Sequence, residues 1–242
     1  MTKDDLARAR EWLAEAQSVT VLTGAGVSAE SGIATFRGPG GVWEKVNPME
    51  LASSEGFRRD PRKVWAWYNA RRRQLLEARP NPGHYALVEL EKRVPCFGLI
   101  TQNVDRLHQA AGSRNVVELH GNIWEVRCTG CGRLEDRTGV ELPDEPHCDH
   151  CGAWLRPNVV WFGEELPSGA WRLAEEWTRR ADVFLVVGTS AEVWPAAGLI
   201  YLAKDAGAKI IEINPEDTAA TKVVDLALRG PSGQILPQIV PA

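Results

Sequence analysis

The chain has 242 residues and a formal net charge of −4; 44% of its residues are hydrophobic and 25% are charged. This composition is ordinary for a globular protein with one good core and argues against an intrinsically disordered chain. The acidic balance disfavours a nucleic-acid partner, because such domains usually carry a basic face. The charged N-terminus lacks the apolar segment of a signal peptide, and no apolar run approaches the roughly 18 residues that cross a bilayer. We therefore expect a cytoplasmic protein with no membrane partner.

Predicted helices and short strands alternate along the chain. An amphipathic helix over residues 4–17 leads into an apolar strand at residues 19–22. Further strands are expected at residues 96–100, 116–118, 183–187 and 209–213, and helices at residues 61–77, 82–92, 104–111, 170–180 and 196–205. This alternation is typical of an α/β fold with a Rossmann-like, doubly wound parallel sheet, in which ligands bind beyond the carboxyl ends of the strands.

Two segments interrupt the alternation, and we expect them to form a smaller lobe. Residues 38–82 carry glycines and a predicted helix, which indicates a helical module with a cofactor loop. Residues 121–157 carry four cysteines and many turn residues, which predicts a zinc-binding module. The Rossmann-like domain would then comprise residues 1–37, 83–120 and 158–242.

The cysteines indicate a metal site. Two C-x-x-C pairs contain four of the five cysteines, namely Cys128, Cys131, Cys148 and Cys151. Two such turns complete a tetrahedron of thiolates around Zn²⁺, and a site filled by four sulfurs is structural. Disulfides or a redox dithiol are less expected in a reducing compartment, although the flanking His147 and His150 are alternative ligands. Cys96 lies in an apolar strand and is expected to be buried.

A glycine motif follows the first strand. Gly24 would allow a tight turn, Gly26 would let the backbone approach a pyrophosphate, and the start of a helix would supply free N–H groups. An ordinary tight turn explains the same residues. Glu44 has the spacing of the acidic residue that usually accompanies such a motif, but its surroundings look like a loop.

Further motifs support a nucleotide site: residues 101–108 (TQNVDRLH), His120-Gly121, residues 35–37, 160–164, 188–190 and 211–214. With these motifs the chain resembles the sirtuin family of NAD-dependent protein lysine deacylases over nearly its whole length. The resemblance implies NAD as co-substrate, structural Zn²⁺, and acyl-lysine proteins or peptides as partners. It also implies release of nicotinamide and O-acyl-ADP-ribose. The oligomeric state stays open, and a monomer is compatible with the sequence.

The resemblance makes His120 the base that activates a ribose hydroxyl, a task that suits imidazole. Asn103 and Asp105 would orient the nicotinamide ribose and its amide. The other cofactor-binding residues that it implies are Gly24, Ala25, Gly26, Ser28, Phe36, Arg37, Trp43, Gln102, Val104, Gly188, Thr189, Ser190, Asn214, Pro215, Glu216 and Ser232. Taken alone, Asn103 and Asp105 could simply cap the following helix, and His120 could be structural.

The resemblance also implies a peptide site, where a substrate pairs as an added strand with Val160, Phe162, Gly163 and Glu164, opposite Val193. The family more often has phenylalanine at the position of Trp161.

Ala52, Tyr68 and Arg71 match the class of sirtuins that removes succinyl and malonyl groups, and acetyl-lysine would fit the same tunnel. Tyr68 and Arg71 lie three residues apart on a predicted helix and share a face, and a guanidinium offers a planar fork to a carboxylate. The alternative is that Tyr68 belongs to the core and that Arg71, Arg72 and Arg73 form a solvated helix face.

Three other functions remain open. ADP-ribosyl transfer to protein begins with the same loss of nicotinamide. A zinc-ribbon interaction module without catalysis would not bind NAD, and it explains neither residues 102–105 nor residues 188–190. An NAD-dependent dehydrogenase would need the acidic residue that the glycine motif lacks.

Overall fold

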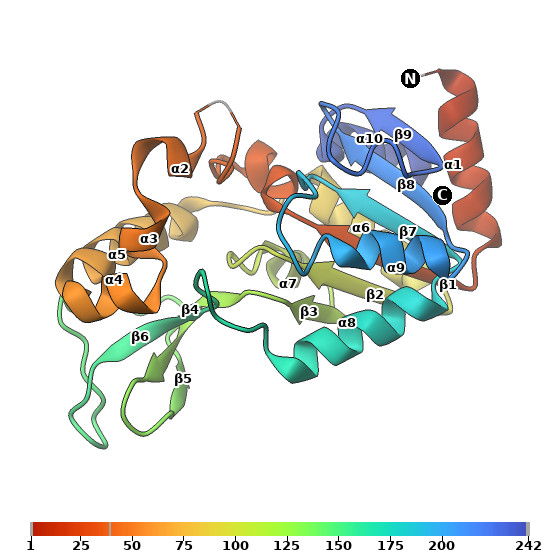
Figure 1. Cartoon of the computed structure of the whole chain (residues 1–242). Coiled ribbons are helices and arrows are strands. Elements are labelled where there is room, and N and C mark those ends of the chain that lie inside the picture. Colours follow the sequence, from red (N-terminus) through yellow and green to blue (C-terminus); the bar gives the residue numbers. More distant parts are fainter. Residues whose placement is uncertain (1, 39, 241–242) are drawn as a thin grey trace.

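The computed structural model describes residues 2–38 and 40–240. Figure 1 shows a larger lobe built around a parallel sheet and a smaller lobe made of short helices and a second sheet. None of the helices in this described part combines the length and the apolarity needed to cross a membrane.

The larger sheet has six parallel strands in the order β3-β2-β1-β7-β8-β9. Their bounds are β1 Ser18–Thr23, β2 Cys96–Thr101, β3 Val116–Glu118, β7 Val183–Val187, β8 Lys209–Asn214 and β9 Leu226–Arg229. The strand order runs outward from β1 in both directions. The chain therefore continues from β1 and from β7 towards opposite edges of the sheet, and such a reversal leaves a crevice for a ligand at the carboxyl ends of the strands. This arrangement confirms the predicted Rossmann-like α/β fold.

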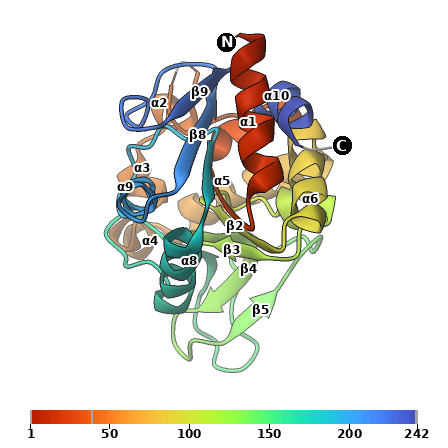
Figure 2. The ribbon, with the colours of Figure 1, turned by 90° about the vertical axis from the view of Figure 1, so that its right-hand side faces the viewer.

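Helices cover both faces of this sheet (Figure 2). One face carries α1 Lys3–Glu15, α6 Pro82–Arg93 and α10 Ser232–Ile239, and the other carries α8 Ser168–Arg180 and α9 Gly198–Asp205. Successive residues of a strand point to opposite faces, so Val21 joins the first core and its neighbour Leu22 joins the second. Because both faces are buried, most strand positions are apolar, although Thr20 in β1 and Glu212 in β8 are buried polar exceptions.

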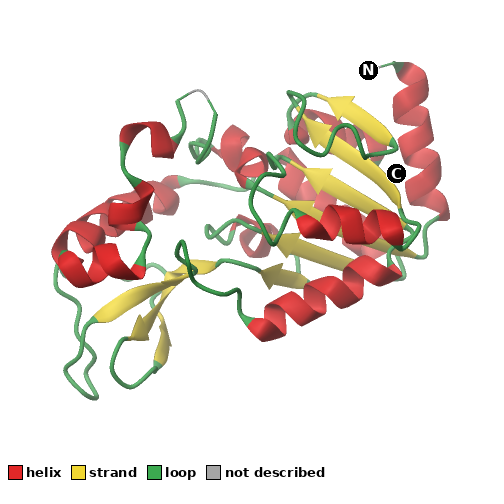
Figure 3. Ribbon diagram, in the orientation of Figure 1, coloured by secondary structure: helices red, strands yellow, loops and turns green. Residues whose placement is uncertain are grey.

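The smaller lobe packs short helices against an antiparallel sheet of order β5-β4-β6 (Figure 3). Its elements are α2 Val42–Lys45, α3 Pro48–Leu51, α4 Ser54–Arg59, α5 Pro61–Glu77, β4 Gly121–Cys128, β5 Leu134–Asp136 and β6 Leu155–Val159. A third apolar core, which includes Trp65 and Ile123, joins the helices to the sheet. Strand β6 runs past residue 157, where we expected the zinc-binding module to end.

One arginine of α5 links the two parts of this lobe. The Arg72 guanidinium donates hydrogen bonds to the carbonyl oxygens of Ile123, Arg137 and Val140, at 2.6, 2.7 and 2.8 Å. It also lies over the ring of Trp124. Arg72 is only 3% exposed, so the expectation of a solvated face of three arginines is wrong at this position. The carbonyl oxygens compensate for the loss of water around the charge.

The segment after Gly24 is helical, as expected, and forms a 3₁₀ helix, η1 Ala25–Ser31. Two other local expectations are wrong. The helix expected from residue 104 begins only at Leu107 (α7 Leu107–Ala111), because Arg106 has a left-handed φ of 62° and the Asp105 carboxylate accepts a hydrogen bond from the Leu107 N–H. Cys96 is exposed, since it is the first residue of β2.

The four cysteines of the C-x-x-C pairs form a cluster beside the smaller sheet, with all sulfur atoms within 4.8 Å of one another. The Cys128 and Cys151 Sγ atoms lie 3.3 Å apart and those of Cys131 and Cys148 lie 3.8 Å apart. These separations exceed the roughly 2.05 Å of a disulfide and suit thiolates around one ion. The flanking His147 instead directs its Nδ1 to the Gly152 carbonyl oxygen. The donor set therefore fits a structural Zn²⁺.

Replacing Cys148 by serine should remove the bound zinc and lower the midpoint of thermal unfolding, because a structural zinc site contributes its binding free energy to folding. Metal analysis and calorimetry of purified protein measure both effects. Cys96→Ser is the matched control and should keep its zinc. A Cys148→Ser variant with full zinc content would contradict this assignment.

Two histidines are buried together between α6 and α7. The rings of His84 and His108 lie 4.8 Å apart, and the residues are 0% and 1% exposed. His108 Nε2 lies 3.0 Å from the Thr23 hydroxyl, and His84 Nδ1 accepts a hydrogen bond from the Asn81 N–H. Burial lowers the pKa of His84 to about 4 and holds the pKa of His108 well below its ordinary value. Both imidazoles are therefore neutral near pH 7.

The free energy of unfolding should fall as the pH falls from 6.5 towards 4, because protons bind these histidines in the unfolded chain before they bind them in the folded one. Each histidine contributes a slope of up to about 1.4 kcal/mol per pH unit. Urea unfolding at several pH values should therefore give a shallower slope for His84→Gln than for the unmodified protein. Equal slopes would contradict the buried, neutral state of His84.

Candidate active site

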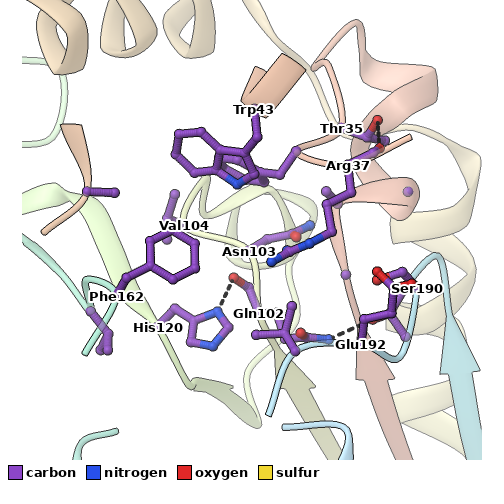
Figure 4. Close-up of a pocket in the computed structure, with 18 of the residues that line it drawn as sticks. Thr35, Arg37, Trp43, Gln102, Asn103, Val104, His120, Phe162, Ser190 and Glu192 are labelled. Carbon is purple, nitrogen blue, oxygen red and sulfur yellow. Dashed lines mark hydrogen bonds between the residues drawn. The ribbon is translucent and has the colours of Figure 1, made fainter. Parts of the chain in front are cut away.

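A cavity of about 710 Å³ lies between the two lobes, at the carboxyl ends of β1, β2, β7 and β8. This volume is typical of a pocket that binds a small molecule or cofactor. Figure 4 shows residues of both lobes around the cavity, with His120, Gln102 and Asn103 facing Phe162, Trp43 and Arg37. The cavity therefore occupies the crevice that the strand order predicts.

The floor of the cavity is a close contact between two glycine loops. The Gly26 N–H donates to the Gly188 carbonyl oxygen at 2.8 Å. A Cβ atom on Gly24 or Gly26 would lie 2.8 Å from this same oxygen, and one on Gly188 would lie 2.4 Å from the Val27 nitrogen. Gly24 itself has an extended backbone, so a lack of space rather than a tight turn requires glycine there. Ala25, Thr189 and Ser190 line the cavity beside this contact.

The loop after β2 is held by a network of buried hydrogen bonds. The Ser28 hydroxyl donates to Asp105 Oδ2 at 2.8 Å, and Asn103 Nδ2 donates to the Ser28 oxygen at 3.2 Å. Burial raises the pKa of Asp105, although its hydrogen bonds with Leu107 and Ser28 act in the opposite direction. Asn103 lines the cavity, whereas Ser28 and Asp105 lie behind it. Asp105 therefore caps α7 and also orients the cavity wall.

His120 follows β3 and directs its Nδ1 to the Gln102 carbonyl oxygen at 3.0 Å (Figure 4). That contact requires a proton on Nδ1 and leaves Nε2 as the basic nitrogen. Burial lowers the pKa of His120, the hydrogen bond to Gln102 raises it, and the nearby Arg37 lowers it; the pKa lies below its ordinary value. His120 is therefore neutral near pH 7 and able to accept a proton from a bound hydroxyl.

An aromatic cluster closes the opposite side. The ring centroids of Phe36 and Trp43 lie 5.3 Å apart, and the Trp43 ring stacks on Trp67 at 5.9 Å. The Arg71 guanidinium lies 4.9 Å from the Phe36 centroid and 5.2 Å from that of Trp67. Phe36, Trp43 and Trp67 therefore give the cavity that His120 lines an apolar wall.

The smaller lobe contributes the far wall, where Ala52, Tyr68 and Arg71 all line the cavity. Tyr68 is buried and accepts a hydrogen bond from the Trp161 indole N–H at 2.9 Å. Within the described ranges, the Arg71 guanidinium forms neither a hydrogen bond nor an ion pair with a protein group. Burial lowers the pKa of Arg71, but a guanidinium stays charged at any working pH. The wall therefore presents a partly desolvated positive charge.

The segment expected to receive a peptide forms one rim. Its N–H groups are largely used, since Val160 donates to the His120 carbonyl oxygen and Phe162 donates to that of Ala52, each at 2.9 Å. Phe162 also forms an isolated parallel bridge with Ser53, whereas among the described residues no N–H group donates to the carbonyl oxygens of Val160 or Gly163. A peptide strand would therefore pair here by donating its own N–H groups, with Val193 on the facing loop.

The other end of the cavity lies beyond β8. Asn214 Nδ2 donates to the Thr189 carbonyl oxygen at 3.1 Å, which joins the loops after β7 and β8. Asn214 and Glu216 line the cavity, whereas Pro215 does not. Ser232, the first residue of α10, is buried away from the cavity wall.

Most of the predicted residues therefore surround one cavity; Ser28, Asp105, Pro215 and Ser232 do not line it. The cavity also contains Trp67, Ile123, Trp161 and Trp194, which sequence reasoning did not assign to it. Trp161 lies inside a recognised motif and Trp67 precedes Tyr68, so their proximity in the sequence was an available signal. Trp194 directly follows the predicted Val193 and had the same signal, whereas Ile123 reaches the cavity only through tertiary packing.

Comparisons with known proteins agree with this geometry. A family model described as the Sir2 family matches residues 24–195. The chain is 54% identical over 230 residues to NAD-dependent protein deacylase 2 of Pyrobaculum aerophilum, covering 94% of this chain and 92% of that protein.

Solved structures are similar throughout. A Sir2 homologue in complex with NAD superimposes with a TM-score of 0.91 at 48% identity, covering 97% of this chain and 92% of the other. A Sir2 protein bound to a myristoylated histone peptide gives a TM-score of 0.79 at 37% identity, covering 99% and 96%. Since the family model matches well over half of the chain and the similarity to the relatives covers nearly all of it, this protein belongs to the Sir2 family.

Proposed function

We propose that this Sir2-family NAD-dependent protein deacylase removes succinyl and malonyl groups, as well as acetyl groups, from lysine side chains. The observation that carries the acidic preference is the guanidinium of Arg71, which lines the cavity without a protein carboxylate as partner in the described structure. The Phe36 and Trp67 rings and the charge of Asp105 compensate only in part for the lost water, and a carboxylate on the acyl chain would supply a direct hydrogen-bonded partner.

The larger lobe binds the co-substrate. When bound, NAD supplies a ribose that accepts the acyl group as nicotinamide leaves. The backbone around Gly24, Gly26 and Gly188 would hold its phosphates, because only glycine lets these loops approach one another so closely. Asn103 would orient the ribose, and its amide is itself oriented by Ser28 and Asp105.

His120 would act as the general base. Its Nε2 is the basic nitrogen because Nδ1 is directed to the Gln102 carbonyl oxygen. Neutral imidazole can accept a proton from a ribose hydroxyl, and the Phe36 and Trp43 rings keep bulk water away from that step.

The smaller lobe would select the acyl group. Ala52 is small and leaves space beside Tyr68 and Arg71, so an acyl chain longer than acetyl fits between them. A carboxylate at its end would meet the Arg71 fork and the Tyr68 hydroxyl, which are both donors at neutral pH. Acetyl-lysine would enter without reaching these donors.

The substrate would be a protein or peptide that pairs with the rim at Val160, Phe162 and Gly163. The carbonyl oxygens of Val160 and Gly163 would accept N–H groups from any sequence, so the pairing would bind many substrates without discriminating between them. The related Sir2 protein with a bound histone peptide supports a peptide as partner.

His120→Asn should lower deacylation of acetyl- and succinyl-lysine peptides by at least about 100-fold, since general bases typically contribute that much. Asparagine can still donate to the Gln102 carbonyl oxygen, so the fold and zinc content should be retained. In the unmodified protein, activity should rise with pH through the lowered pKa of His120 and then level off. Initial rates measured by peptide mass test this role, and retained turnover in the variant would refute it.

Arg71→Met should reduce desuccinylation about 10- to 100-fold more than deacetylation, because a hydrogen bond to a charged group contributes roughly 1.5–3 kcal/mol. The quantity to measure is kcat/KM for two peptides that differ only in the acyl group. Arg73→Met, an exposed residue on the same helix, is the control and should leave the ratio of the two rates unchanged. Equal losses for both peptides in Arg71→Met would show that Arg71 does not recognise the acid.

A further inference from the structure

Trp161 contacts the acyl wall through its polar edge. Its indole Nε1–H donates to Tyr68 Oη at 2.9 Å, and the residue is only 2% exposed. Both side chains line the cavity. The indole therefore does more than fill space, because its one polar atom, Nε1, is directed at the Tyr68 hydroxyl.

This bond determines how Tyr68 can act. A phenol has one O–H donor and lone pairs that accept. Once a lone pair accepts the indole N–H, the Tyr68 hydrogen is free to donate to a third group. Burial raises the pKa of Tyr68 to about 12, which outweighs the opposing effects of Trp161 and Arg156, so the hydroxyl keeps its proton. At the cavity wall, the Tyr68 hydroxyl is therefore oriented to donate its hydrogen rather than to accept one.

The position of Trp161 is fixed by an ion pair. The Arg156 guanidinium lies 3.5 Å from the centroid of the Trp161 ring and donates to Glu164 Oε1 and Oε2 at 2.5 and 2.9 Å. The Trp161 backbone N–H donates to Glu164 Oε2 at 2.9 Å. Burial acts to raise the pKa of Glu164, but Arg156 and the other donors lower it to about 2, so the pair stays ionised. The cation over the ring is itself an attractive contact that holds the indole in place.

We propose that Trp161 is a positioning residue for acidic acyl groups: its indole N–H sets Tyr68 to donate its hydroxyl hydrogen to the carboxylate that Arg71 binds. The inference rests on the proposed function, since it needs an acyl chain that ends in a carboxylate. Phenylalanine at this position would fill similar space but leave Tyr68 without its donor.

Acetyl-lysine provides a comparison within the same active site. It has no terminal carboxylate, so the Tyr68 hydroxyl has nothing to donate to, whereas a succinyl group does. A role of Trp161 in packing alone would affect both acyl groups alike. The ratio of desuccinylation to deacetylation is therefore the quantity that distinguishes positioning from packing.

Trp161→Phe should lower kcat/KM for a succinyl-lysine peptide roughly three- to tenfold more than for the matched acetyl-lysine peptide, the size expected for one hydrogen bond. The loss should fall mainly on KM for the peptide, because the contact binds the acyl chain away from the reacting carbon. Trp154→Phe is the matched control: it makes the same change in the same lobe, at a residue that does not line the cavity.

The double variant tests whether Trp161 acts through Tyr68. Tyr68→Phe should lose at least as much selectivity as Trp161→Phe, and adding Trp161→Phe to it should cause no further selective loss. Equal losses for both acyl groups in Trp161→Phe, or additive losses in the double variant, would overturn the inference. If the unmodified protein removes no succinyl group, the proposed acidic preference fails and this inference with it. If Arg71→Met is selective and Trp161→Phe is not, only this inference fails.

Discussion

The site depends on one constraint, the close approach of two loop backbones at the carboxyl ends of the central strands β1 and β7. The loops after β1 and β7 touch through Gly26 and Gly188, where no side chain fits. This contact closes the point where the strand order diverges, so the open crevice begins directly above it. The loops after β2 and β3 and the end of β8 then bring Gln102, His120 and Asn214 around the same space.

The two lobes divide the chemistry between them. In the larger lobe, the strand ends position the neutral imidazole of His120 and the contact between Gly26 and Gly188 that forms the cavity floor. The smaller lobe provides the cavity wall that carries Arg71. The position of this wall depends on several contacts between side chains rather than on one residue. Arg72 joins α5 to the zinc-bearing sheet, and Arg156 holds Trp161 against Tyr68. The four cysteines do not line the cavity, but a zinc ion bound by them would stabilise the sheet on which the acyl wall rests.

The sequence was sufficient for the fold and for most of the cavity, because apolar strands and contiguous motifs are local signals. Strands β3 and β7 match their predicted bounds, and helix α5 matches residues 61–77. Tertiary effects decided the rest. Arg72 is buried because three carbonyl oxygens from distant parts of the chain accept its hydrogen bonds. Ser232 lies away from the cavity because α10 packs into the core beside α1 and α6. The contact between Trp161 and Tyr68 joins residues 93 positions apart, and no local pattern reveals it.

The most direct test of the account uses the unmodified protein with two peptides that differ only in carrying acetyl- or succinyl-lysine, each with and without NAD, followed by mass spectrometry of the peptide and the nucleotide. The account predicts that both peptides lose their acyl mass only when NAD is present, that the acyl mass appears on ADP-ribose, and that the succinyl peptide reacts at least as well as the acetyl peptide. A peptide that stays acylated, or that gains the mass of ADP-ribose instead, would contradict it.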